Sequence, residues 1–319
     1  MSQSAAEPTT PARTTAPTDP PRGGPDRPGS GPGTTGPSGP GAPSDPGTPT
    51  VVPAPQPPQH RAAPPRVPQT RWTDPRVANA YARRDESLDR SLLWPLLAEQ
   101  VRPAEVQRET GRPDAEVLEL GSGLGGLSHL LATAQWTRAY AVDLSPAVHR
   151  AGVRRYQDDW IKRVLPSRSS WRFPLDNRLC TGAVAQFLLL HLRHPAEVIS
   201  VLSEARRVLR PGAPLVLLEP AGHGGPAGTV QWGGTRWGEP APDAPGKSAP
   251  QLEEGQPFLA HYRLRGGATF SASAWHHSPA AVAGCLRCCG FRLTDITPLT
   301  VPGANTSDPP FHLWRAIAE

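Results

Sequence analysis

The chain has 319 residues and a formal net charge of +5, and Arg supplies nearly all of its positive charge because Lys occurs only at Lys162 and Lys247. The length allows one large domain or two small ones. The sequence has no dense basic block with interleaved aromatic residues, which argues against nucleic acid as a partner. It also has no apolar signal region at its start and no run of about 18 apolar residues, so we expect a cytoplasmic protein without a membrane span.

Residues 1–70 have the composition of a segment that does not fold. Of the 42 prolines in the chain, 20 lie here, and Gly, Ser and Thr make up nearly half of the rest. Such a segment buries too little apolar surface to offset the entropy lost on ordering. We therefore expect a disordered tail over residues 1–70, followed by a folded domain over residues 71–319.

Strand and helix patterns alternate along the folded part, which predicts one doubly wound α/β domain. In chain order, the apolar spacing predicts a helix at Asp74–Gln100, a strand at Val117–Leu120 with a helix from Leu127, a strand at Ala139–Val142, a helix at Pro146–Gln157, a strand at Thr181–Leu189, a helix at Pro195–Leu209, a strand at Leu215–Leu218, a helix at Pro279–Cys289 and final strands at Phe291–Ile296 and Phe311–Ile317.

One long segment, Ala221–Pro257, interrupts this alternation. It is rich in Gly and Pro and carries Trp232 and Trp237. Loops of this length inside a domain are usually functional. We expect a substrate lid or insertion, in which replacing either Trp by Ala weakens acceptor turnover and leaves cofactor binding intact.

The four cysteines do not predict a metal site. Cys180 stands alone, while Cys285, Cys288 and Cys289 form C-x-x-C-C without a second ligand pair at suitable spacing. The triplet falls in the last predicted helix, where small buried Cys side chains pack like other apolar residues. We expect no bound metal.

The glycine-rich stretch Gly121–Gly126 is the feature around which the domain is organised. It reads G-S-G-L-G-G and lies between the apolar strand Val117–Leu120 and a helical pattern. Glycine allows a sharp turn and a close approach of the backbone to a ligand. The start of the following helix offers unpaired N–H groups to a polar or anionic group. The stretch therefore predicts a site for a nucleotide-type cofactor.

Asp143 follows the second predicted strand, 22 residues after Gly121. This is close to the spacing at which dinucleotide-binding folds place a carboxylate on the ribose hydroxyls. The alternative is that Asp143 caps the next helix, ahead of Ser145 and Pro146. Given the glycine turn upstream, ribose binding is the preferred interpretation.

Five segments together resemble the class I S-adenosylmethionine-dependent methyltransferases, over about Trp72 to Glu319. They read E-L-G-S-G-L-G at Glu119–Gly125, V-D-L-S-P at Val142–Pro146, P-L-D-N at Pro174–Asn177 followed by A-V-A-Q-F-L-L-L-H-L at Ala183–Leu192, A-R-R-V-L-R-P-G-A-P-L-V-L-L-E-P at Ala205–Pro220, and C-G-F-R-L-T-D-I at Cys289–Ile296. The resemblance implies a mostly parallel seven-stranded sheet with helices on both faces. It also implies S-adenosyl-L-methionine as the cofactor.

The resemblance assigns a role to each matching position. The methionine part of the cofactor is expected at Glu119 and at the turn residues Gly121, Ser122, Gly123 and Gly125. The ribose is expected at Asp143 and the adenine at Leu144, while Gln186 is expected to face cofactor and substrate and Tyr81 to cover the cofactor. Family members usually carry an acid after the third strand that reads the adenine amino group, and the segment Trp171–Phe173 has none.

The expected activity is methyl transfer to a small-molecule acceptor, a metabolite or specialised natural product. One alternative is a nicotinamide-dependent oxidoreductase, since Gly121, Gly123 and Gly126 also satisfy G-x-G-x-x-G. Another is a non-catalytic module that binds the cofactor. A general base is needed only if the acceptor loses a proton; no catalytic residue is assigned, and the candidates by residue type are His191, His194, His276 and His277.

Overall fold

The computed structural model describes residues 70–101, 115–135, 137–167, 170–221, 230–232, 235–237, 252–300 and 311–319, all within one compact unit, Ala63–Glu319. The expected tail over residues 1–70, apart from Thr70, lies outside the described residues, as does most of the excursion at 221–257 with the side chains of Trp232 and Trp237. Among the described helices, none has the length and apolar character required to cross a membrane.

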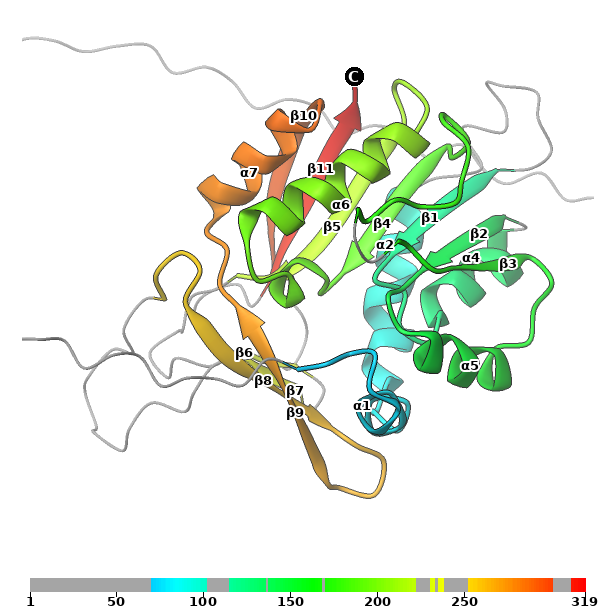
Figure 1. The fold of residues 1–319 in the computed structure, drawn as a ribbon, viewed down its shortest axis with the longest axis vertical. Helices are drawn as coiled ribbons and strands as arrows, with labels where there is room; N and C mark the ends of the chain where they lie inside the picture. The colour runs from blue at the N-terminus through cyan, green and yellow to red at the C-terminus, as the bar shows by residue number, and fades with distance from the viewer. Residues whose placement is uncertain are drawn as a thin grey trace, which may run out of the picture. The chain divides into compact units, whose positions relative to one another are not determined.

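A seven-stranded sheet forms the centre of the fold (Figure 1). Its order is β10-β11-β5-β4-β1-β2-β3. The five strands from β5 to β3 are parallel, while β11 runs antiparallel to both of its neighbours. This confirms the expected α/β class with a mostly parallel sheet. The strands are β1 (Glu116–Leu120), β2 (Arg138–Val142), β3 (Ile161–Val164), β4 (Gly182–Gln186), β5 (Pro214–Pro220), β10 (Phe291–Leu299) and β11 (Phe311–Ala318).

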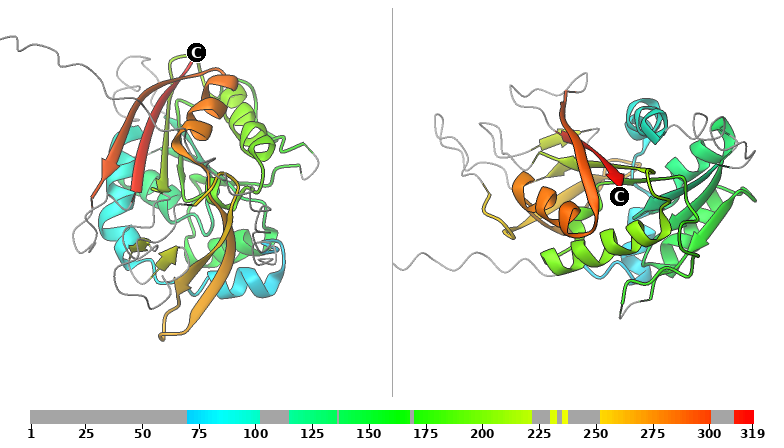
Figure 2. Two further views of the ribbon diagram at one scale, coloured as in Figure 1. Left: turned by 90° about the vertical axis from the view of Figure 1, so that its left-hand side faces the viewer. Right: turned by 90° about the horizontal axis from the view of Figure 1, so that it is seen from above.

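Helices cover both faces of this sheet (Figure 2). Alternate strand residues point to opposite faces, so Leu118 packs with one helix layer and Val117 with the other. The first layer holds α6 and α7, and the second holds α2 and α4, while α5 packs against α1 at the edge. The helices are α1 (Pro75–Tyr81), α2 (Trp94–Val101), α4 (Gly126–Gln135), α5 (Pro146–Arg155), α6 (Pro195–Val208) and α7 (Pro279–Cys288).

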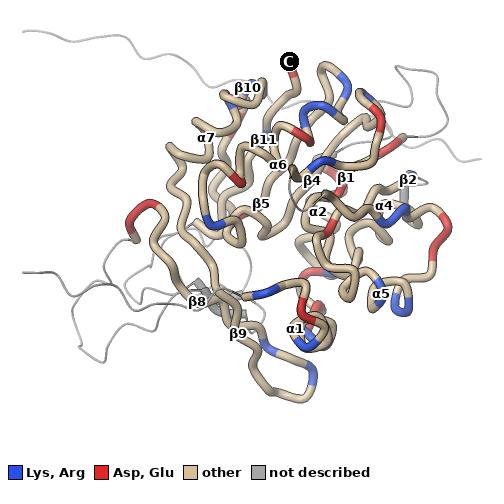
Figure 3. The backbone as a smooth tube through the Cα atoms, in the orientation of Figure 1, with Lys and Arg blue, Asp and Glu red and all other residues tan. Residues whose placement is uncertain are grey.

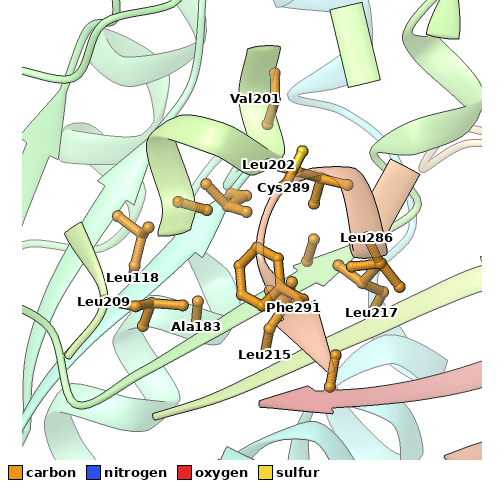
Figure 4. Packing of buried hydrophobic residues seen from close by; sticks show 14 of the residues in the cluster. Leu118, Ala183, Val201, Leu202, Leu209, Leu215, Leu217, Leu286, Cys289 and Phe291 are labelled. Atoms are coloured by element: carbon orange, nitrogen blue, oxygen red, sulfur yellow. The ribbon is translucent and has the colours of Figure 1, made fainter. Parts of the chain in front are cut away.

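The layer under α6 and α7 is closely packed (Figure 4). Leu202 of α6, Leu286 of α7 and Leu215 of β5 are fully buried in it, with Phe291 between them. Cys289 and Cys285 are buried in the same cluster as free thiols, as expected for small apolar residues. Burial of this apolar surface fixes α6 on the sheet, and α6 in turn borders the functional site.

The prediction of a single helix at Asp74–Gln100 is wrong. The structure has α1, then a break, then a short π-helix η1 (Asp89–Leu93) that leads into α2. The break occurs because backbone groups of residues 83–85 pair with a hairpin far along the chain: the Asp85 N–H donates to the Arg263 carbonyl and the Arg265 N–H to the Arg83 carbonyl. This tertiary pairing overrides the helical spacing of the apolar residues.

The predicted strand Thr181–Leu189 ends earlier than expected. β4 stops at Gln186, and residues Leu189–His191 form a 3-10 helix, η2. Phe187 adopts a left-handed backbone conformation, with φ 54°. The carboxylate of Glu219 at the end of β5 accepts the N–H groups of Leu188 and Leu189, at 2.9 and 2.7 Å, which holds the chain in this turn.

A second sheet was not expected. It has four antiparallel strands in the order β6-β7-β8-β9, with β6 (Val230–Trp232), β7 (Thr235–Trp237), β8 (Pro257–Arg263) and β9 (Thr269–Trp275). The β8–β9 turn contains Gly266 and Gly267, with φ of 93° and 88°. The excursion at 221–257 therefore contributes β6 and β7 to this second sheet.

Thr70, which the composition assigns to the tail, is the first described residue and contacts β9. The Thr70 N–H donates to Ser273 Oγ at 2.6 Å, and the Ser273 N–H donates to Thr70 Oγ1 at 2.7 Å. Trp72 then packs its ring on Tyr81, with centroids 5.4 Å apart. The segment that leads into α1 is thus tied to β9 by specific contacts.

Two truncations test this boundary. Deleting residues 1–69 should leave the melting temperature unchanged, because their composition offers little apolar surface to a core. Deleting residues 1–72 also removes both Thr70 hydrogen bonds and the Trp72 ring, a loss of at least about 2 kcal/mol that should lower the melting temperature by roughly 4–8 °C. A drop of several degrees in the shorter truncation, measured by differential scanning fluorimetry, would contradict the assigned boundary.

Candidate functional site

The site lies where the strand order of the large sheet reverses. From β1 the chain proceeds to β2 and β3 on one side, whereas β4 and β5 lie on the other. In open α/β sheets such a switch point leaves a crevice at the carboxyl ends of the strands, where ligands bind. A cavity of about 260 Å³ occupies this position, bordered by the residues that follow β1, β2 and β4.

The turn after β1 has glycine at three positions whose backbone conformation favours it. Gly121, Gly123 and Gly125 have φ of +65°, +54° and +80°. A Cβ on Gly121 would lie 2.8 Å from the Leu188 side chain, and one on Gly123 would lie 3.0 Å from the ring of Tyr81. Gly121, Ser122 and Gly123 line the cavity, so the turn is a cradle that side chains would fill.

Gly125 lies on the other side of the turn. It is not among the residues that line the cavity, and a Cβ here would meet the Arg163 guanidinium at 2.6 Å. Arg163 donates a hydrogen bond to the Leu124 carbonyl at 2.8 Å, which stabilises the turn on the side away from the cavity. Gly125 therefore shapes the turn, and the turn residues beside it contact the cavity.

Glu119 joins the cavity to the first turn of α4. Its Oε2 accepts the Ser128 N–H at 2.9 Å and also the Ser128 hydroxyl. Burial raises the pKa of this carboxyl to about 7, and the bonds from Ser128 oppose that shift. A carboxylate at this place complements the positive end of the helix.

Asp143 stands at the end of β2 and lines the same cavity. Its Oδ2 accepts the Gly123 N–H at 3.0 Å, and its Oδ1 accepts the Ser145 N–H at 2.9 Å. The helix-cap alternative is wrong, because the cap of α5 is Ser145, whose side chain accepts the Val148 N–H. A carboxylate has about four lone-pair sites, so two bonds leave further acceptor capacity. Burial raises the pKa of Asp143 to about 6, with the two amide bonds opposing it.

The other expected cofactor residues come together here. Leu144, Gln186 and Tyr81 all line the cavity. Ser122 is buried, and its hydroxyl has no hydrogen-bond partner among the described residues. An unsatisfied buried hydroxyl in a glycine cradle fits a polar ligand better than an empty apolar void.

Gln186 has less freedom than the sequence suggests. Its amide nitrogen donates to Asp89 at 2.9 Å, and its amide oxygen accepts the Trp94 indole N–H at 2.9 Å. Asp89 is buried, which raises its pKa, and Arg84 opposes that shift through an ion pair of 2.7 Å. The amide of Gln186 thus connects β4 to η1 and α2 as well as bordering the cavity.

Of the four candidate histidines, only His191 lines this cavity. Its Nε2 lies 2.9 Å from the Tyr262 hydroxyl and its Nδ1 lies 3.3 Å from the Ser273 carbonyl. Burial lowers the pKa of His191 to about 4, against the effect of the bond to Ser273, so the ring is neutral at pH 7. A carbonyl oxygen accepts a hydrogen bond only from a nitrogen that carries a proton. The proton of His191 is therefore on Nδ1, and Nε2 accepts the hydrogen bond from the Tyr262 hydroxyl.

The remaining histidines lie elsewhere. His276 and His277 border a separate cavity of about 30 Å³ beside Glu219. His277 Nε2 lies 2.8 Å from the Leu192 carbonyl, and its Nδ1 lies 3.2 Å from Glu254. His194 is exposed at the start of α6.

The family resemblance places the segment Trp171–Phe173 directly after the third strand of the sheet, but this strand, β3, ends earlier in the chain. β3 stops at Val164, so Trp171–Phe173 is not the segment at its carboxyl end. The described residues that follow β3, 165–167 and 170–173, contain no acid. Pro166, Trp171 and Phe173 line the cavity next to Leu144 and give this part an apolar wall.

Several residues of the site were missed by sequence reasoning. Glu197 lies on α6, which the sequence predicts, and the others border the cavity from elements that were unexpected or broken differently: Trp72, Arg84, Trp94, Phe187, Tyr262 and Trp275. The alternation of apolar residues in F-L-A-H-Y-R at 258–263, followed by Gly266 and Gly267, is the signal that could have revealed β8 and its hairpin.

The fold and the site define an α/β enzyme that binds a nucleotide-type cofactor at the switch point of its sheet. Residues 117–212 match the family model described as a methyltransferase domain. The chain contains an S-adenosylmethionine-dependent methyltransferase domain, and S-adenosyl-L-methionine is its cofactor. This confirms the family that the five sequence segments resemble.

Three solved structures are similar to this chain at low identity. A S-adenosylmethionine-dependent methyltransferase from Clostridium acetobutylicum ATCC 824 has 10% identity and a TM-score of 0.50, covering 73% of this chain and 95% of that one. The CcbJ methyltransferase from Streptomyces caelestis has 20% identity and a TM-score of 0.47, covering 69% and 89%. The glycopeptide N-methyltransferase MtfA complexed with S-adenosyl-L-methionine has 20% identity and a TM-score of 0.45, covering 69% and 93%. No curated protein sequence matches the chain.

Proposed function

We propose that the protein methylates a small-molecule acceptor held in the cavity above the glycine turn. The observation that carries this proposal is the set of aromatic residues in the wall of the cavity. Trp72, Tyr81, Tyr262 and Trp275 line the cavity from the segment before α1, from α1 and from β8 and β9. A site walled by large apolar side chains with a few polar groups suits a small organic molecule.

The charges of the described chain support the same acceptor class. Lys and Arg are interspersed with Asp and Glu along the backbone, and the described part shows no dense basic block (Figure 3). Tracking a nucleic-acid backbone requires a concentrated positive surface. A small-molecule acceptor therefore fits better than a nucleic acid.

The chain has residues that fit each part of the cofactor. The cradle at Gly121–Gly123, with the unsatisfied hydroxyl of Ser122, would hold the methionine part, and Asp143 would accept the ribose hydroxyls. Leu144 would pack on the adenine. Bound S-adenosylmethionine supplies an electrophilic methyl group on a sulfonium. The protein's own task is to hold the acceptor in line at near-contact distance, which is worth up to about 7–11 kcal/mol.

Where the acceptor must lose a proton, His191 and Tyr262 are the groups we assign to receive it. The Tyr262 hydroxyl donates to His191 Nε2, so its oxygen can accept the proton of an acceptor hydroxyl while its own proton passes to Nε2. The Ser273 carbonyl fixes the tautomer that makes Nε2 the acceptor. Trp72 packs edge-on against the imidazole, with centroids 4.8 Å apart, and covers part of the ring.

Thermal shift with four ligands tests the proposal. S-adenosylmethionine and S-adenosylhomocysteine should raise the melting temperature, whereas NAD⁺ and NADP⁺ should not, because only a ligand that binds the folded state stabilises it. Transfer of labelled methyl groups to a panel of small hydroxyl and amine acceptors, compared with mixed RNA and DNA, then tests the acceptor class. Labelling of nucleic acid with no labelling of small molecules would contradict the proposed acceptor.

A further inference from the structure

One acidic residue borders the cavity away from the glycine turn. Beyond Asp143 the wall is formed by Leu144 and Val148 after β2, by Pro166 after β3, and by Trp171 and Phe173. These side chains offer a nucleobase apolar surface but no charged hydrogen-bond acceptor. The acidic residue that borders the cavity from the α6 side is Glu197.

The position of Glu197 follows from the way α6 packs. Glu197, Val201 and Glu204 stand at spacings of four and three residues, so they lie on one face of the helix. Glu204 Oε2 accepts the Phe173 N–H at 3.0 Å, which fixes the segment that leads from Trp171 to Phe173 against this face. Val201 packs in the same cluster as Phe173 and also lines the cavity. Glu197 therefore lies one turn beyond Val201, on the face of α6 that borders the apolar part of the cavity.

The carboxylate of Glu197 retains acceptor capacity. Its Oε2 accepts the Arg193 N–H at 2.6 Å, which holds the side chain at the start of α6. A carboxylate has about four lone-pair sites, so most of them remain open after this bond. The other two acids of the cavity accept hydrogen bonds close to the glycine turn: Glu119 from Ser128, and Asp143 from the Gly123 and Ser145 N–H groups.

We propose that Glu197 recognises the 6-amino group of the cofactor's adenine ring, an inference that rests on the cofactor orientation proposed above. The amino group is a pure donor, and a carboxylate is a pure acceptor. A hydrogen bond to a charged group is stronger than one between neutral groups. Recognition of the base thus comes from the first turn of α6, and the wall of Leu144, Pro166 and Trp171 supplies the apolar contacts.

A comparison of two ligands in three proteins tests this role. The ligands are S-adenosylhomocysteine and S-inosylhomocysteine, in which a carbonyl oxygen replaces the 6-amino group. Isothermal titration calorimetry should show that Glu197→Ala weakens binding of the adenine ligand at least about tenfold and leaves binding of the inosine ligand unchanged or stronger. Glu197→Gln should lose less with the adenine ligand and gain with the inosine ligand, because its amide can donate to the carbonyl oxygen.

Trp171→Leu serves as the matched control, because it changes the apolar wall and should weaken both ligands alike. Equal losses for both ligands in Glu197→Ala, or no loss for either, would overturn the role of Glu197 and leave the cofactor assignment intact. Absence of S-adenosylhomocysteine binding by the wild-type protein would instead overturn the cofactor orientation on which the inference rests. Melting curves of the free variants confirm that each is folded.

Discussion

Replacing Asp143 by Ala should weaken binding of S-adenosylhomocysteine by at least about 3 kcal/mol, or roughly a hundredfold or more in dissociation constant. The carboxylate lines the cavity at the end of β2 and would accept two hydrogen bonds from the ribose hydroxyls. Asp143→Asn should cost less, since its amide oxygen still accepts a bond but carries no charge. Calorimetric titration of the three proteins measures the difference.

The structure changes what is expected of stability in these variants. The sequence suggests that the Ala variant loses only a helix cap of about 1 kcal/mol. The carboxylate instead holds the Gly123 and Ser145 N–H groups, so its loss loosens the turn itself and leaves two buried donors without a partner. The melting temperature of the free Ala variant should therefore fall by more than the loss of a cap explains. Affinity like that of the wild type in a folded Asp143→Ala protein would contradict the ribose assignment.

The raised pKa of Asp143 predicts a specific dependence on pH. Burial raises it from 3.8 to about 6, so the folded protein holds this proton more tightly than the unfolded chain, and the stabilisation that protonation provides is lost as the pH rises toward about 6. Ligand affinity should move in the opposite direction, because the charged carboxylate accepts the ribose bonds. Titrations at pH 5.5, 6.5 and 7.5 should show affinity rising with pH, and this Asp143 component should be absent in Asp143→Asn.

Replacing His191 by Ala should lower the turnover of a hydroxyl acceptor by about 10²–10⁴-fold and leave the affinity for S-adenosylhomocysteine within about twofold. Tyr262→Phe should give a similar loss, because it removes the hydroxyl that links the acceptor to Nε2. His194→Ala is the matched control, since His194 is exposed at the start of α6 and should retain the normal rate. The measurement is transfer of labelled methyl groups under saturating cofactor.

The pH–rate profile separates catalysis through the buried His191 from catalysis through an exposed histidine. With its pKa near 4, His191 is already in its basic form above pH 6, so the wild-type rate should be flat from pH 6 to 8 as far as His191 is concerned. An exposed His would instead give a rate that rises near pH 6.5. Near-normal rates in both His191→Ala and Tyr262→Phe would show that catalysis proceeds by positioning alone or through another base.

The sequence predicts the elements whose signals are local. The apolar strand before Gly121, the glycines that permit positive φ, and Asp143 at the next strand end all occur within 27 residues, from Val117 to Asp143. Their order is sufficient to predict the parallel sheet and the position of the cofactor cavity. The expected residues Glu119, Ser122 and Tyr81 do line that cavity.

The sequence does not predict the part of the site that depends on distant pairing. The break after α1 exists because residues 83–85 bond to residues 263 and 265, and the His191–Tyr262 pair joins positions 71 residues apart. The helical periodicity around residue 84 does not indicate that these residues pair with a hairpin, because the same side chains are compatible with a continuous helix. Gln186 was expected to face a ligand, but Asp89 and Trp94 occupy its amide through contacts more than 90 residues apart.

A crystal structure of the protein with S-adenosylhomocysteine is the measurement that tests the proposed site most directly. It should show the ribose hydroxyls within hydrogen-bond distance of Asp143, the amino acid part of the ligand over Gly121–Gly123, and the base against Leu144 with its amino group facing Glu197. A ligand bound in this cavity with its ribose away from Asp143, or bound outside the cavity, would contradict the account.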